Sequence, residues 1–206
     1  MRITAAEKED TRERIIAAAV DQFRNCGFEA ATTRDIARQA QIATGTLFNY
    51  FNSKEAIVLA LAADALAAAD DDFAKAKRPD APLEEDIFLY VASGLRRLKR
   101  HRSYLGPVIQ AALSPLVAAD RLKDIDALRE HHLGRVSETL SAHGFADPSS
   151  VHLQLYWTLY LGILSYWISD RSPKQEDSRV LIDQSVSMFC DWLRRPASES
   201  VAEKEQ

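Results

Sequence analysis

The chain has 206 residues, 47% of them hydrophobic, which is enough for one large domain or two small ones with a buried core. Glycine and proline are few, at seven each, and no alternating run of β-branched residues predicts a strand, so an all-α fold is expected. The net charge of −4 gives no general attraction to nucleic acid, although only the face that meets phosphate has to be basic.

The charge is divided unevenly along the chain. Residues 1–55 hold eight Lys or Arg and eight Asp or Glu, whereas residues 56–206 hold 18 against 22 and account for the whole net charge. The two cysteines, Cys26 and Cys190, show neither CxxC nor metal-ligand spacing, which predicts a reduced, cytoplasmic protein. The first residues lack the apolar core of a signal peptide. An N-terminal nucleic-acid-binding segment is therefore compatible with the composition.

Apolar residues at helical spacing predict a first helix over residues 11–25. The residues expected on its buried face are Ile15, Ile16, Ala19, Val20 and Phe23. The spacing of Thr4 and Glu7 fits a capping box upstream, with Asp10 as an alternative cap. Gly27 is the expected C-cap.

A turn of three residues, 41–43, separates a second predicted helix, over 32–40, from a third that begins with the sequence TGTLFNYF. Thr32 or Thr33 can cap the second helix, and Thr44 the third. Two short helices joined by such a turn form a helix-turn-helix, whose second helix enters the major groove of DNA. Leu47 and Phe51 are expected to pack inward with Ile16, Val20, Phe23 and Ile36. The alternative is a third helix wholly buried in a bundle.

Over residues 12–58 the chain resembles the TetR family of bacterial transcriptional regulators. The resemblance runs through TTRDIA, GTL, YF and SKE. It implies an all-helical homodimer whose N-terminal three-helix domain, residues 1–53, binds a near-palindromic double-stranded DNA operator. In the family, residues matching Arg34, Thr44, Gly45, Phe48 and Asn49 approach bases, and those matching Thr33, Thr46, Tyr50 and Lys54 hold phosphates. Phe48 departs from the usual Tyr, and Gln41 from a Gly that adopts positive φ easily.

The rest of the chain predicts a larger helical domain, residues 54–195, which brings the total to about nine helices, followed by a disordered tail over 196–206. Ser53 is expected to cap a long alanine-rich helix. The further helices are expected over 54–77, 83–104, 106–117, 120–142, 149–170 and 175–195, with proline or glycine at the breaks. The resemblance assigns this domain to ligand binding and dimerisation.

From Ser149 to Ser169 no residue is charged, a length that could span a bilayer. Polar residues are spread through the segment and no basic loop flanks it, so a homodimer interface, formed with the last helix as a four-helix bundle, is favoured over internal core or a membrane span. The residues expected at this interface are Leu155, Leu159, Gly162, Tyr166, Leu181, Ser185, Phe189 and Trp192.

A pocket for a small-molecule effector is expected near Phe88, Tyr104, Trp157 and Tyr160, although for any one of these aromatics an ordinary core or dimer contact is the more common role. His131 and His132 point in different directions on a helix and make poor joint metal ligands. No catalytic or phosphate-binding motif occurs, so neither an enzyme nor a cofactor is expected. The sequence predicts a repressor released from its operator by a ligand. The alternatives are an activator, a regulator controlled by a protein partner, and a helical enzyme with a vestigial helix-turn-helix.

Overall fold

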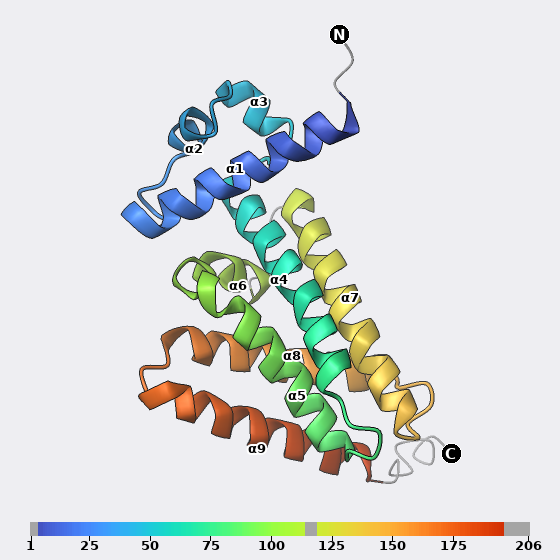
Figure 1. Ribbon diagram of the computed structural model, residues 1–206. Coiled ribbons are helices and arrows are strands. Elements are labelled where there is room, and N and C mark those ends of the chain that lie inside the picture. Colours follow the sequence, from blue (N-terminus) through green and yellow to red (C-terminus); the bar gives the residue numbers. More distant parts are fainter. Residues whose placement is uncertain (1–3, 114–118, 196–206) are drawn as a thin grey trace, which may run out of the picture. The chain divides into compact units, whose positions relative to one another are not determined.

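The computed structural model describes residues 4–113 and 119–195, and this part of the chain is helical throughout, with no strand (Figure 1). It contains nine α-helices and two short 3₁₀ helices, which confirms the predicted fold class. Their bounds are α1 Ala5–Cys26, α2 Thr33–Gln39, α3 Thr44–Phe48, α4 Lys54–Ala76, α5 Leu83–Leu98, η1 Lys99–Tyr104, α6 Gly106–Leu113, α7 Ala119–Ala142, α8 Ser150–Ser169, η2 Pro173–Gln175 and α9 Glu176–Leu193. The tail predicted over 196–206 and the end of the helix predicted over 106–117 lie outside the described residues.

The chain forms two compact units. The first consists of Met1–Ala69 with Arg96–Arg129, and the second of Asp70–Leu95 with Glu130–Gln206. Helices α4, α5 and α7 each contribute residues to both units. The predicted DNA-binding segment 1–53 therefore lies within the first unit, which also includes most of α4.

The ends of the first helices follow from local hydrogen bonds. The predicted capping box starts α1: the Thr4 hydroxyl accepts from the Glu7 N–H at 3.2 Å, and the Glu7 carboxylate accepts from the Thr4 N–H at 2.8 Å. Gly27 ends α1 with φ 83°. Thr32 caps α2. The cap predicted for α3 is wrong, because the helix begins one residue earlier than expected: Ala43 is the N-cap and Thr44 is already helical.

Helices α1–α3 bury a small apolar core. Its fully or almost fully buried side chains are Ile15, Ala18, Ala19, Phe23, Ile36, Ala37, Leu47 and Phe51. Ile16 and Val20 are only half-buried, so the prediction that these two fill the core is wrong. The helix is turned so that Ile15 and Ala18 take the inner positions. The short α3 is thus anchored chiefly by one side chain, Leu47.

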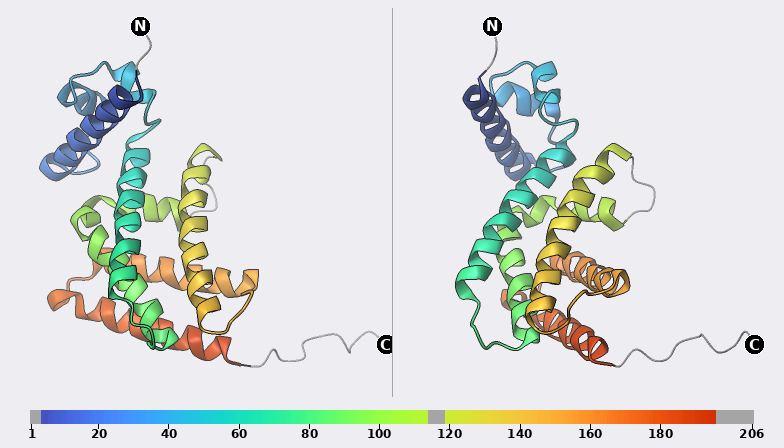
Figure 2. Two further views of the ribbon diagram at one scale, coloured as in Figure 1. Left: turned by 45° about the vertical axis from the view of Figure 1, so that its right-hand side comes forward. Right: turned by 90° about the vertical axis from the view of Figure 1, so that its right-hand side faces the viewer.

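In the second unit α8 and α9 lie alongside each other, as the views of Figures 1 and 2 agree. Ser149 caps α8 and accepts from the His152 N–H at 3.3 Å. Asp170 ends α8 and accepts from the Ser172 N–H at 2.7 Å, from the Ser178 N–H at 3.0 Å and from the Ser178 hydroxyl at 2.5 Å. One carboxylate therefore holds the reversal between the two helices. None of the helices described is long and apolar enough to cross a membrane.

Candidate nucleic-acid interface and regulatory core

The turn between α2 and α3 is fixed by backbone and side-chain hydrogen bonds. Gln41 takes the left-handed conformation, with φ 57°, at the position where the sequence lacks the usual glycine. The Ile42 N–H donates to the Ala37 carbonyl at 3.0 Å, and Arg14 of α1 donates to the Ala40 carbonyl at 2.6 Å. α1 thereby holds the turn that sets the direction of α3.

The aromatic-rich sequence of α3 divides into an inner and an outer face. Leu47 is fully buried, whereas its neighbour Phe48 is 50% exposed. Gly45 and Asn49 are exposed, and Thr44, Thr46 and Tyr50 are half-buried. The inward packing of Leu47 and Phe51 is confirmed. The outward face has the small, hydroxyl-bearing and amide residues that can approach base edges and phosphates.

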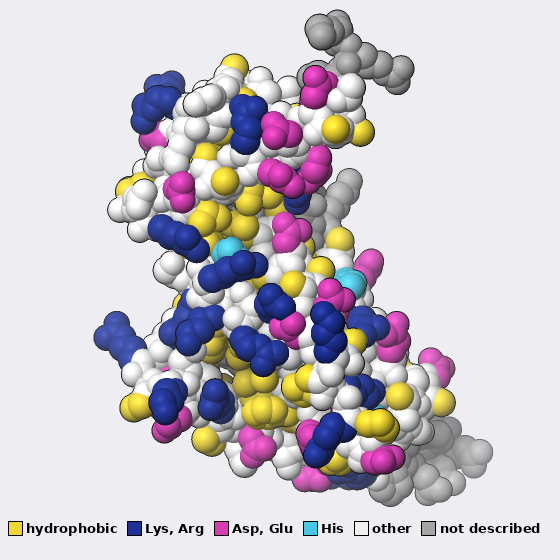
Figure 3. Space-filling model, viewed as in Figure 1, with side chains coloured by type: hydrophobic (Ala, Val, Ile, Leu, Met, Phe, Trp, Pro, Cys, Tyr) yellow, Lys and Arg dark blue, Asp and Glu magenta, His cyan; other side chains and the backbone are white. Residues whose placement is uncertain are grey.

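Helix α2 presents charge beside this face. Arg34 is exposed, Thr33 is half-buried, and the Arg38 guanidinium pairs with Asp35 at 2.6 Å. The Thr32 hydroxyl, followed by Arg38, holds the pKa of Asp35 below its usual value, so this carboxyl stays ionised at neutral pH. Both signs of charge occur on the α1–α3 module, at the top of Figure 3, as the sequence count predicts. Any attraction to phosphate is thus local.

The Lys54 amine, which was predicted to contact a DNA phosphate, is bound to backbone carbonyls instead. Its amine donates to the carbonyls of Phe28 at 2.7 Å and Glu29 at 3.2 Å, and lies 4.3 Å from the centre of the Phe28 ring. These contacts tie the loop after α1 to the start of α4. The predicted phosphate contact would require the amine to leave these carbonyls, because they direct it into the module.

Two family models match the chain. The model for bacterial regulatory proteins of the tetR family matches residues 15–61, and that for the tetracyclin repressor-like C-terminal domain matches residues 87–205. The second match alone covers more than half of the 206 residues. This chain belongs to the TetR family. It is therefore a member of a family of helix-turn-helix, DNA-binding transcriptional regulators, as the resemblance predicted.

Individual relatives agree with this assignment. The regulator SrpR of Pseudomonas putida is 44% identical over 62 residues, which are 30% of this chain and 29% of that protein. The repressor KstR of Rhodococcus jostii is 25% identical over 202 residues, 94% of this chain and 90% of that protein. The solved structure of the TetR-family repressor FadR of Thermus thermophilus, in complex with lauroyl-CoA, has a TM-score of 0.71 at 22% identity and covers 92% of this chain and 98% of that one.

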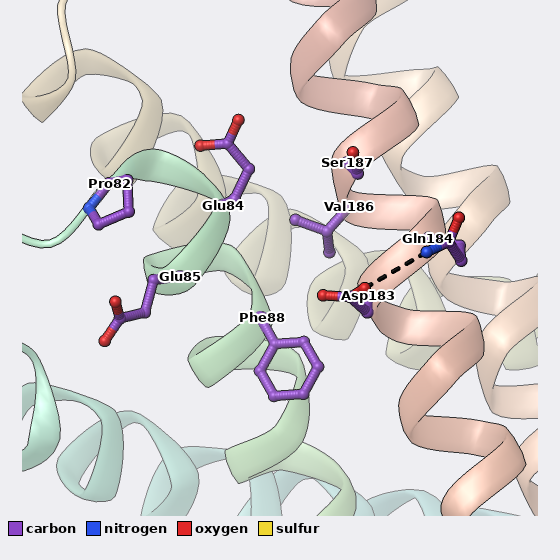
Figure 4. A pocket seen from close by; sticks show the side chains of 8 residues that line it. All are labelled: Pro82, Glu84, Glu85, Phe88, Asp183, Gln184, Val186 and Ser187. Carbon is purple, nitrogen blue, oxygen red and sulfur yellow. Dashed lines mark hydrogen bonds between the residues drawn. The ribbon is translucent and has the colours of Figure 1, made fainter.

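The four aromatics predicted to line a pocket lie in different surroundings in this TetR-family protein. Tyr104 belongs to the first unit, where its ring packs on Phe23 at 5.1 Å and its hydroxyl bonds His101. Phe88 lines a groove of about 440 Å³ between α5 and α9 (Figure 4). Trp157 and Tyr160 alone share a buried cluster, their ring centres 5.6 Å apart. Within the second unit the structure thus brings Trp157 and Tyr160 together and places Phe88 at the groove between α5 and α9.

The groove beside Phe88 is acidic at its rim. Glu84 and Glu85 of α5 and Asp183 of α9 line the groove together with Phe88, and the Gln184 side-chain amide donates to the Asp183 carboxylate at 3.4 Å (Figure 4). Glu84 is paired with Arg194, and Glu85 pairs with Arg78 at 2.5 Å. Two of the three carboxylates thus already have a cationic partner.

The buried cluster in the second unit centres on His132, which no sequence pattern marked as a member of a pocket. The His132 ring lies among Tyr90, Tyr156, Trp157 and Tyr160, with its centre 4.1 Å from that of Tyr160. Burial lowers the pKa of His132 to about 3, so the ring is neutral at physiological pH. The i, i+4 spacing of Tyr156 and Tyr160 is visible in the sequence. That α7 supplies their polar partner, His132, is a tertiary contact that the sequence does not reveal.

The eight residues predicted at a dimer interface lie on both sides of α8 and α9. Phe189 is 1% exposed and Ser185 8% exposed within one chain, so both pack mainly into their own unit, although Phe189 also lines a groove between α8 and α9. Gly162 and Tyr166 are exposed, and Leu155, Leu159, Leu181 and Trp192 are half-buried. The outer face of α9 also carries Val180 and Met188, which are 60% and 65% exposed and were not among the predicted interface residues.

Proposed function

We propose that this TetR-family protein is a homodimeric repressor of the bacterial cytoplasm that binds a near-palindromic operator and leaves it when a small molecule binds. The contrast between buried Leu47 and exposed Phe48 carries the DNA-binding part of the proposal. The exposed Phe48 ring, on a face that it shares with exposed Gly45 and Asn49, suits contact with a thymine methyl.

In the proposed complex, each chain places residues 44–50 in a major groove. Arg34 and Asn49 meet base edges, and Thr33, Thr46 and Tyr50 position the module on phosphates. The two recognition helices of a dimer would lie about 34–36 Å apart, one turn of DNA. A ligand that favours a dimer with another spacing lowers operator affinity, since it binds the two states with different free energies.

The relatives support the sign of regulation and the ligand. KstR is named a repressor, and FadR is a repressor whose structure holds lauroyl-CoA. A long acyl thioester therefore suits a protein with this fold. For the present chain we propose an effector with a largely apolar body, because the second unit buries mostly aromatic and aliphatic side chains.

Selection of bound fragments from genomic DNA by the purified protein tests the operator. We expect enrichment of a site with two-fold symmetry. Binding to all fragments alike, with a steep dependence on salt, would instead be non-specific phosphate attraction and would contradict the proposal. Transcription from a reporter that carries the enriched site distinguishes a repressor from an activator.

The variant Arg34→Ala tests base reading. We expect it to weaken operator binding by about 1–3 kcal/mol and to relax sequence preference at one base pair of each half-site, if Arg34 pairs with a guanine. Arg171→Ala is the matched control, since Arg171 is an exposed arginine in the second unit and its removal changes the net charge equally. Equal affinities of the two variants, with unchanged site preference, would remove Arg34 from the interface.

A further inference from the structure

The buried cluster of the second unit contains a nearly complete chain of hydrogen bonds. His132 Nδ1 lies 3.3 Å from the Tyr90 hydroxyl, and Nε2 lies 3.0 Å from the Tyr156 hydroxyl. The neutral ring has one N–H and one acceptor nitrogen, so one tyrosine accepts from it and the other donates to it. Both nitrogens of His132 are therefore already used.

Tyr160 is the exception in this cluster. Its side chain is 3% exposed and stacks on the His132 ring, yet its hydroxyl has no hydrogen-bond partner among the described protein groups. A buried hydroxyl without a partner loses its hydration and gains nothing in return, so proteins rarely keep one without a functional reason. The hydroxyl of Tyr160 is thus a donor available to a molecule that enters the cluster.

The charges near the cluster are compensated. The Asp70 carboxylate interacts with Tyr90 and is paired with His131 at 2.7 Å and with Arg135 at 4.0 Å. The other titratable groups around Tyr160 are His132, Tyr90 and Tyr156, and all are neutral at physiological pH because burial opposes their charged forms. A charged group placed against Tyr160 would lose its hydration without finding a counter-charge.

We propose that Tyr160 donates the hydrogen bond that recognises the effector, and that the effector is an uncharged, largely apolar molecule with a carbonyl-type oxygen at this point. This inference rests on the proposed ligand control. The surrounding rings meet at centre distances of 4.1–6.2 Å, so an entering molecule must separate them. Because α5, α7 and α8 carry these rings, entry of the effector displaces helices and so links binding to conformation.

The first experiment needs no ligand and compares Tyr160→Phe with Tyr156→Phe at one protein concentration. Tyr156→Phe removes a hydrogen bond to His132 and should lower Tm by about 2–4 °C. Tyr160→Phe removes only an unpartnered hydroxyl and should leave Tm unchanged or raise it. A loss of Tm in Tyr160→Phe equal to that in Tyr156→Phe would show that the hydroxyl has a partner in the free protein, a buried water, and would overturn the proposal.

The second experiment uses 2-heptanone, 2-nonanone and 2-undecanone as probes, with tryptophan fluorescence as the readout, since Trp157 adjoins Tyr160. The controls are the 2-methyl-1-alkenes of the same length, which replace the carbonyl oxygen by a methylene group. The wild type should bind at least one ketone more tightly than the matching alkene. Tyr160→Phe should lower the affinity for the ketone by about 3- to 10-fold and leave the affinity for the alkene unchanged. The proposal would be refuted if Tyr160→Phe lost equal affinity for ketone and alkene, or if the wild type bound no ketone up to the solubility limit.

Operator binding by the same preparations, without a probe, separates the two proposals. Tyr160→Phe should bind the operator as the wild type does. If the wild type binds its operator but does not bind the ketones, the inference about Tyr160 is refuted and the proposed DNA-binding function stands. A wild type that binds no operator refutes the proposed function, whatever the ketones do.

Discussion

Gln41 is the only residue of the turn between α2 and α3 that adopts the left-handed conformation, with φ 57°. An L side chain in this conformation is strained, whereas glycine adopts it without a Cβ clash. We expect Gln41→Gly to raise the free energy of unfolding by about 0.5–1 kcal/mol, as the relief of strain exceeds the greater freedom of glycine in the unfolded chain. Chemical denaturation at fixed protein concentration measures this.

Gly27→Ala is the companion variant. Gly27 also has positive φ, 83°, and a Cβ there would meet no atom within 4 Å, so any effect comes from the backbone conformation. We expect Gly27→Ala to lower the free energy of unfolding by about 1 kcal/mol. A stabilising Gly27→Ala, or a destabilising Gln41→Gly, would show that backbone strain does not control stability at these two sites.

At the scale of residues, the sequence predicts a feature best where one local rule governs it. The resemblance to the TetR family implies a glycine at position 41, and Gln41 adopts there the positive φ that a glycine would take easily. The partners of Lys54 were not predictable, because the carbonyls of Phe28 and Glu29 come within its reach only when the loop after α1 folds back. Tertiary contacts of that kind leave no periodic signal.

At the scale of elements, Asp170 controls how α9 follows α8. The Ser178 hydroxyl, with Ser172, holds the pKa of Asp170 well below its usual range. A carboxyl whose pKa is lower in the folded state stabilises the fold above its unfolded pKa of about 3.9, and this contribution is lost as the pH falls toward the folded pKa. The stability of the second unit should therefore decline in acid partly through this residue.

The variant Asp170→Asn tests this linkage. It should have a lower Tm than the wild type at neutral pH, and the difference should shrink below about pH 4, where the wild type begins to lose the same contribution. Asp71→Asn is the control, since Asp71 is an exposed residue of α4 and should change Tm little at any pH. A difference between Asp170→Asn and the wild type that is constant with pH would mean that the carboxylate charge is not what stabilises the turn.

Helix ends were more predictable than helix faces. Caps depend on a few neighbouring residues: of the two candidates Thr32 and Thr33 the structure has Thr32, and Ser53 is confirmed, since it accepts from the Ala56 N–H at 3.1 Å. The helix predicted over 83–104 instead tightens into 3₁₀ geometry at Lys99, where the i, i+3 pair His101 and Tyr104 forms a hydrogen bond. Which side chains of α9 are buried depends on the helices that pack against it, so the burial of Phe189 within its own unit could not be predicted from the sequence.

At the scale of the whole molecule, the proposed operator binding requires two chains, and the outer face of α9 offers a surface for the second. Leu155, Leu159, Met188 and Trp192 line a groove of about 310 Å³ between α8 and α9. Met188 is 65% exposed, and Val180, further toward the N-terminus of α9, is 60% exposed. Such a surface suits a dimer interface, which buries an apolar core within a polar rim.

We expect Met188→Glu to raise the dimer dissociation constant at least tenfold, about 1.4 kcal/mol or more, because it places an uncompensated charge in a desolvated interface. Sedimentation equilibrium measures this constant, and operator affinity should fall with it, since one chain contacts only one half-site. Phe48→Ser is the matched control: it also replaces an exposed apolar side chain, but should weaken operator binding and leave the dimer intact. If Met188→Glu stays as dimeric as Phe48→Ser, the chains associate through another surface, and the spacing of the recognition helices is set elsewhere in the molecule.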